Sequence, residues 1–132
     1  MTLEVEVAGL ERTGGSLAAP DVEQLVSLAL ASAGIEDGHV AVSLVDAEEI
    51  RALNREHRGR DAPTDVLSFP VDGAEPAAGP RELGDVVICP AETEDLREAV
   101  VHGALHLAGM DHETDDGEML ALQRELLRWV SP

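Results

Sequence analysis

The sequence predicts a single compact α+β domain with a roughly four-stranded mixed sheet and about four helices. Four short segments alternate in polarity or are continuously apolar, as strands do, and four longer segments combine helical periodicity with capping residues. Their chain order is β-α-β-α-β-β-α-α, which favours helices and strands packed in layers around one core. Because 132 residues are typical of one domain, we expect residues 1–132 to form a single unit.

The first half of the chain contains two strands, each followed by a helix. Residues 3–7 alternate between apolar and acidic side chains, and residues 39–46 alternate again. Asp21 is expected to cap the first helix, over 22–34. The second helix, over 46–59, has a capping aspartate, early glutamates and a closing glycine, which together indicate a complete helix.

The pattern of the second half of the sequence predicts two successive strands and then two helices. The strands are expected at 66–71 and 85–90, joined by a loop rich in proline and glycine. One helix is expected from about residue 93 to residue 108, and the last helix over 115–130. Trp129 is expected to pack this last helix against the rest of the domain.

The composition argues against several classes of protein. No segment approaches the roughly 18 apolar residues that a membrane helix needs, and the alternating acidic N-terminus is unlike a signal peptide. We therefore expect a cytoplasmic protein without a membrane partner. The single cysteine, Cys89, cannot form an internal disulfide, and we interpret it as a small buried apolar residue.

The net charge of −18 argues against nucleic acid as a partner, but the basic residues are unevenly distributed. All nine are arginine, and four of them lie between residues 51 and 60 with one glutamate, so that this segment carries a net +3. Arginine can bind phosphate in a planar, bidentate geometry. The alternative is a solvated helix face whose arginines pair with nearby acids. The four arginines are Arg51, Arg55, Arg58 and Arg60.

Three of the five histidines lie within eleven residues, at His102, His106 and His112. The first two are four residues apart in a predicted helix, so their side chains share one face. Gly109 is expected to end the helix. The chain can then turn back, so that His112 completes a set of three nitrogen ligands for one metal ion. Three such ligands with one open position are typical of catalytic zinc, although nickel, copper or iron are also accepted. The alternative is that these histidines are buried packing residues.

A zinc peptidase would have a glutamate beside the first histidine, at the position of Gly103. The absence of this base argues against peptide hydrolysis by that route. Asp85 and Asp111 are the candidate carboxylates for a base located elsewhere. Asp111 adjoins a predicted ligand, so we favour a role in orienting that ligand over a role in proton transfer.

Three segments form a wider pattern: LNREHRGRDAPTDVLSFP (53–70), LGDVVICP (83–90) and HGALHLAGMDH (102–112). In this order they resemble the signatures of the YbeY family of bacterial rRNA maturation factors, over most of residues 40–130. The resemblance implies a metal-dependent endoribonuclease that is specific for single strands. It also implies a role in maturing the 3′ end of 16S rRNA and in ribosome quality control.

The resemblance also implies functions for particular residues. The three histidines would be the ligands of one Zn²⁺ per chain, and Arg58 would be the functional arginine. We expect Arg58, joined by Arg55 or Arg60, to bind phosphate, while Asp65 and Ser68 line the cleft.

Two features indicate that a partner positions the RNA. Single-stranded RNA usually stacks on aromatic side chains, but the chain has only Phe69 and Trp129. Because the chain is also acidic, we expect weak intrinsic affinity for RNA, with the ribosome or ribosomal proteins supplying the positioning. Two alternatives stay open: a metal-dependent hydrolase of another substrate, and a non-catalytic ribosome-assembly factor with a structural metal.

Overall fold

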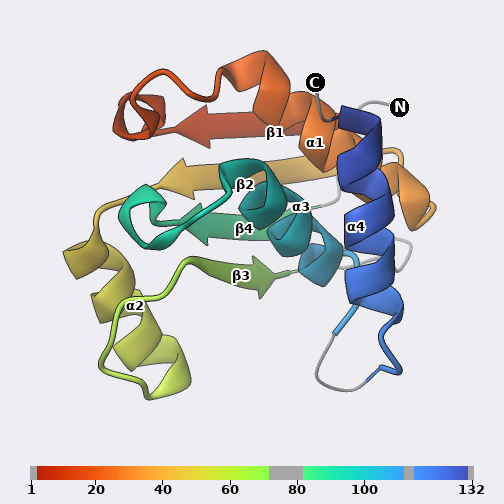
Figure 1. Ribbon diagram of the computed structural model, residues 1–132. Helices are drawn as coiled ribbons and strands as arrows, with labels where there is room; N and C mark the ends of the chain where they lie inside the picture. Colours follow the sequence, from red (N-terminus) through yellow and green to blue (C-terminus); the bar gives the residue numbers. More distant parts are fainter. Residues whose placement is uncertain (1–2, 72–81, 112–114, 131–132) are drawn as a thin grey trace.

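The structure, a computed structural model, describes residues 3–71, 82–111 and 115–130. Within these residues, four strands form one mixed sheet with helices on both of its faces (Figure 1). The strands and α-helices follow the order β-α-β-α-β-β-α-α, which confirms the predicted fold class. The strands are β1 (Leu3–Ala8), β2 (Gly38–Leu44), β3 (Val66–Pro70) and β4 (Glu82–Ile88).

The helices of the described residues comprise four α-helices and two short 3-10 helices. None of them has both the length and the apolarity that a bilayer-spanning segment requires. The α-helices are α1 (Ala19–Ser32), α2 (Ala47–Arg58), α3 (Leu96–Leu107) and α4 (Glu118–Val130), and the 3-10 helices are η1 (Leu10–Thr13) and η2 (Pro90–Glu92).

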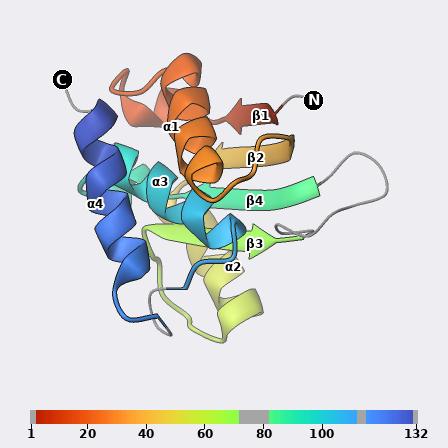
Figure 2. The same cartoon turned by 90° about the vertical axis from the view of Figure 1, so that its right-hand side faces the viewer.

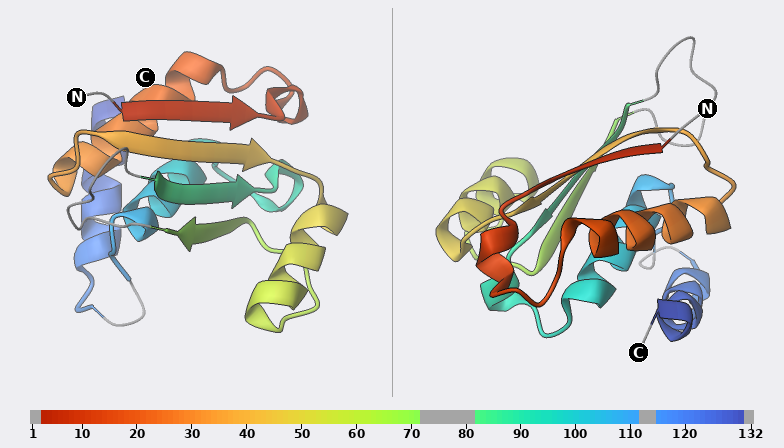
Figure 3. Two further views of the ribbon diagram at one scale, coloured as in Figure 1. Left: turned by 180° about the vertical axis from the view of Figure 1, so that it is seen from behind. Right: turned by 90° about the horizontal axis from the view of Figure 1, so that it is seen from above.

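The strands are ordered β1-β2-β4-β3 across the sheet. β1, β2 and β4 run parallel, and β3 pairs antiparallel with β4 at the edge. The sheet separates a large buried cluster, under α1, α3 and α4, from a smaller one under α2 (Figure 3). Because successive strand residues point to opposite faces, Val86 and Ile88 join the large cluster while Val87 and the buried Cys89 join the small one.

The ends of α2 follow the predicted capping pattern. Asp46 precedes the helix and accepts a backbone hydrogen bond at 2.8 Å, and Gly59 closes it with a φ of 71°. The start of α1 differs from the prediction that Asp21 precedes the first turn. The helix begins before Asp21, because Pro20 is well suited to the first turn, where the backbone N–H that proline lacks would have no partner within the helix. Asp21 instead accepts a hydrogen bond from the backbone N–H of Ala18 at 2.9 Å.

Several predictions for the second half are wrong in detail. The helices expected from about residue 93 and from residue 115 begin at Leu96 and Glu118. The strand expected at 85–90 begins three residues earlier, where β4 pairs with β2, and the chain leaves the sheet at η2. Trp129 does not pack against the body of the domain, since 73% of its surface is exposed. The buried face of α4 includes Met119 and Leu126, and Trp129 lies at the margin of that face in the last turn.

His39 forms a polar cluster with two carboxylates. Its Nδ1 lies 2.8 Å from Oε2 of Glu82 and its Nε2 lies 3.3 Å from Oε1 of Glu6. The hydrogen bond to Glu82, followed by that to Glu6, raises the pKa of the His39 imidazole above its ordinary value. The protonated ring therefore stabilises the fold below about pH 6.5, and this contribution is lost as pH rises through the raised pKa.

We expect the melting temperature of the native chain to fall between about pH 6 and pH 8 as His39 loses its proton, and we expect His39→Gln to reduce this fall. Thermal unfolding at several pH values measures this effect. His57→Gln, which removes an exposed histidine without a carboxylate contact in the described residues, is the matched control and should keep the native pH profile. A native profile in His39→Gln would contradict the assignment.

Candidate active site

Helix α3 contacts β3, β4, α1 and α4 (Figure 2). Two of the three predicted ligands lie on this helix. Asp95 caps its first turn by accepting hydrogen bonds from the backbone N–H groups of Arg97 and Glu98, at 3.0 and 3.3 Å. His102 and His106 are one turn apart, so their side chains leave the helix on the same side. Their ring centroids lie 4.8 Å apart with the rings inclined at 75°.

Both histidines line a cavity of about 520 Å³. Its walls come from the end of α2, from β3 with the two residues before it, and from the C-terminal half of α3 with the turn that follows. Separate parts of the chain therefore meet at one cavity, and this brings several of the predicted site residues together. The predicted residues that line the cavity are Arg58, Asp65, Ser68, His102, His106 and Asp111.

Other predicted residues do not line this cavity. Asp85 pairs with Phe69 across the sheet and, by strand alternation, points to the face opposite α3, so the structure separates it from the histidines. Arg55 and Arg60 are exposed outside the cavity. The third predicted ligand, His112, lies outside the described residues.

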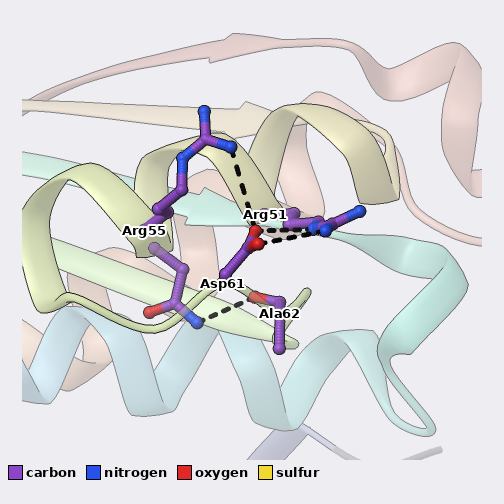
Figure 4. A network of polar contacts seen from close by, with 5 residues as sticks. Arg51, Arg55, Asp61 and Ala62 are labelled. Carbon is purple, nitrogen blue, oxygen red and sulfur yellow. Dashed lines mark hydrogen bonds and ion pairs between the residues drawn. The ribbon is translucent and has the colours of Figure 1, made fainter.

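The segment between α2 and β3 is held by a network around Asp61 (Figure 4). Arg51 donates to both carboxylate oxygens of Asp61, at 2.8 and 3.2 Å, and Arg55 lies 3.9 Å from one of them. The hydrogen bond from Arg51 holds the pKa of the Asp61 carboxyl below its ordinary value. The buried Asn54 donates to the carbonyl oxygen of Ala62 at 2.9 Å. This network orders the segment that joins Arg58, at the end of α2, to Asp65, and it pairs Arg51 and Arg55 with an acid.

Gly103 lies where α3 approaches the sheet most closely. A Cβ atom at this position would come within 2.4 Å of Cγ1 of the buried Val86. The Ser68 hydroxyl donates a hydrogen bond to the carbonyl oxygen of Gly103 at 3.0 Å, so this hydroxyl binds the helix to β3. A glutamate at position 103, where a zinc peptidase has its base, would therefore clash with the sheet, because this position faces it.

We expect Gly103→Ala to lower the free energy of unfolding, because overpacking outweighs the better helix propensity of alanine. The net loss should be about 1–2 kcal/mol. Urea unfolding measures it. A double variant with Val86→Ala, which removes the clashing methyl groups, should lose less than the sum of the single changes. Additive losses would contradict this steric account.

Gln123 is a site residue that the sequence analysis missed. It lies on α4 with 6% of its surface exposed, and its Oε1 is 2.8 Å from Nδ1 of His102. The signal that could have revealed it is a polar residue within the apolar face of an amphipathic helix, between Met119 and Leu126.

The donor set fits a transition metal of borderline softness. Two imidazoles line one cavity at helical spacing, and one of them is held at its other nitrogen by Gln123, as is usual for metal-binding histidines. Among the residues that the structure describes, no group of three potential ligands is found. The third predicted ligand, His112, is not among these described residues.

A family model described as Endoribonuclease YbeY matches residues 16–131, nearly the whole chain. The chain belongs to the endoribonuclease YbeY family. Membership assigns it to a family of nucleases and confirms the predicted resemblance. The Endoribonuclease YbeY of Rubrobacter xylanophilus is 42% identical, with 98% of both chains covered. That of Macrococcus caseolyticus is 39% identical, with 82% of both chains covered.

A solved structure also resembles this YbeY-family chain. The solution structure of TM1509 from Thermotoga maritima has a TM-score of 0.57 and 29% sequence identity. The similarity covers 94% of this chain and 87% of the other. The α+β arrangement described above is therefore shared with an experimentally determined fold.

Proposed function

We propose that this chain is a zinc-dependent endoribonuclease that cuts single-stranded RNA in the cytoplasm. Its proposed substrate is the 3′ region of 16S rRNA, with a further role in ribosome quality control. The observation that carries the proposal is the presence of His102, His106 and Arg58 around one cavity. Metal-binding and phosphate-binding side chains together are what hydrolysis of a phosphodiester requires.

The proposed metal ligands are His102, His106 and His112. When bound, zinc would activate water as a nucleophile and polarise a phosphoryl oxygen. Asp65 and Asp111 also line the cavity, and their carboxylates would repel a phosphodiester in the absence of a cation. This acidic lining therefore favours a site that binds RNA with a divalent cation.

Arg58 is the proposed phosphate-binding residue. Unlike Arg51 and Arg55, it forms no ion pair with any residue in the described part of the chain. Its guanidinium group can therefore donate in a bidentate way to non-bridging phosphate oxygens and stabilise the charge that develops in the transition state.

Asp111 is proposed to orient the neighbouring ligand His112 rather than to transfer protons. Of the two carboxylates considered as a base, it is the one that lines the cavity, whereas Asp85 points to the other face of the sheet and has no part in this proposal. A carboxylate beside a metal-binding histidine commonly fixes the orientation of the ring.

The ribosome or ribosomal proteins are the proposed partners that position the RNA. Phe69 is half-buried and packs edge-on against His57, and the exposed Trp129 is on α4, outside the cavity. The site therefore offers no aromatic platform from these two residues, and the net charge of −18 opposes binding of free RNA.

The proposal is tested by measuring bound metal and RNA cleavage on the same purified preparation. We expect about one zinc ion per chain, cleavage of a labelled single strand, and no cleavage of the matching duplex. Removal of zinc with a chelator should stop cleavage, and added zinc should restore it. Bound zinc without RNA cleavage would instead support a hydrolase of another substrate or a non-catalytic assembly factor. A chain without metal would contradict the proposed site.

A further inference from the structure

We propose that Gln123 is a positioning residue for the metal site and that it acts through His102. Its side-chain oxygen accepts a hydrogen bond from Nδ1 of His102, which selects the ring form whose Nε2 can bind a metal. This inference rests on the proposed function, because it assigns a role toward the metal of that site.

The position of Gln123 is not explained by packing. The neighbouring buried residues on the same face of α4 are Met119, which is fully buried, and Leu126, which is as buried as Gln123 at 6% exposure. An apolar side chain of similar size would fit this face without the unfavourable burial of an amide. Among the described residues, the other buried polar side chain is Asn54, and its amide anchors the segment before β3.

The hydrogen bond determines where the proton of His102 resides. A neutral imidazole carries one N–H group, and an amide oxygen only accepts hydrogen bonds. With Oε1 of Gln123 2.8 Å from Nδ1, we assign the proton of the neutral ring to Nδ1, which leaves the lone pair of Nε2 for a metal. The ring is also held in one orientation by α4, which packs beside α3 (Figure 1). Groups that hold metal-binding histidines in this way typically change metal affinity about 10–100-fold.

The test compares the native chain with three variants. Gln123→Met removes the acceptor at similar size, Gln123→Glu keeps an acceptor oxygen, and Leu126→Ala loosens α4 at an equally buried position without altering the hydrogen bond. Two quantities are measured on the full chain: the ring form of His102, from imidazole nitrogen chemical shifts of the metal-free protein, and the dissociation constant of Zn²⁺, by competition with a chelator.

We expect the native chain to have its proton on Nδ1 of His102, and Gln123→Met to lose this preference and bind Zn²⁺ about 10–100-fold more weakly. Gln123→Glu should restore both properties, and Leu126→Ala should keep both while unfolding at a lower temperature. Unchanged ring form and affinity in Gln123→Met would overturn the inference and leave the metal site intact. Equal losses in Leu126→Ala would also overturn it, because packing alone would then explain them. If the native chain bound no zinc, the proposed function would fail and this inference with it, whereas native zinc binding with an unchanged ring form and affinity in Gln123→Met would overturn the inference alone.

Discussion

Arg58→Glu is expected to keep native zinc content and to lose RNA cleavage by about 10³-fold, the scale on which arginine stabilises phosphoryl transition states. The reason is that Arg58 lines the cavity and forms no ion pair within the described residues, so its charge is available to the substrate. Metal content by mass spectrometry and initial cleavage rates on a labelled single strand measure the two effects separately.

The matched control is Arg128→Glu, which changes the net charge equally at an exposed position on α4. It should cleave within a few-fold of the native rate. If zinc content fell in Arg58→Glu, the division between metal-binding histidines and a phosphate-binding arginine would be wrong. Equal loss of cleavage in Arg128→Glu would indicate a general effect of charge instead.

His106→Ala is expected to abolish both zinc binding and cleavage. A metal that binds the folded chain stabilises it by mass action, by about 2.7 kcal/mol at a free zinc concentration of 100 times the dissociation constant. The native chain should therefore melt at a higher temperature with zinc than without it, and His106→Ala should not. Calorimetry with and without zinc measures this difference.

His57→Ala is the control for loss of a histidine, since His57 lies on α2 outside the cavity. It should retain zinc and the zinc-dependent rise in melting temperature. Cleavage that persists in His106→Ala would indicate a contaminating nuclease or a site that does not depend on this histidine.

Sequence reasoning succeeded where the signals are local. The spacing of His102 and His106 places them on one helix face whatever the tertiary structure, and the cap and closing glycine of α2 act within one turn. The start of α1 was misplaced because Asp21 can satisfy a backbone donor from within the first turn as well as from the capping position.

Sequence reasoning failed where the answer depends on packing between distant segments. β4 is buried on both faces around Val86 and Val87. Because its apolar residues do not alternate with polar ones, the sequence does not show on which face of the sheet Asp85 lies. Gln123 meets His102 across 21 residues, through the packing of α4 on α3, and no local pattern joins the two. The steric need for Gly103 likewise appears only once α3 lies on the sheet.

Anomalous X-ray scattering from crystals of the zinc-loaded chain is a direct test of the proposed site with three histidine ligands. It identifies the bound element and counts its protein ligands. We expect one zinc peak in the cavity beside Arg58, about 2.0–2.1 Å from one nitrogen each of His102, His106 and His112. A peak bound by other residues, or no peak at the histidines, would contradict it.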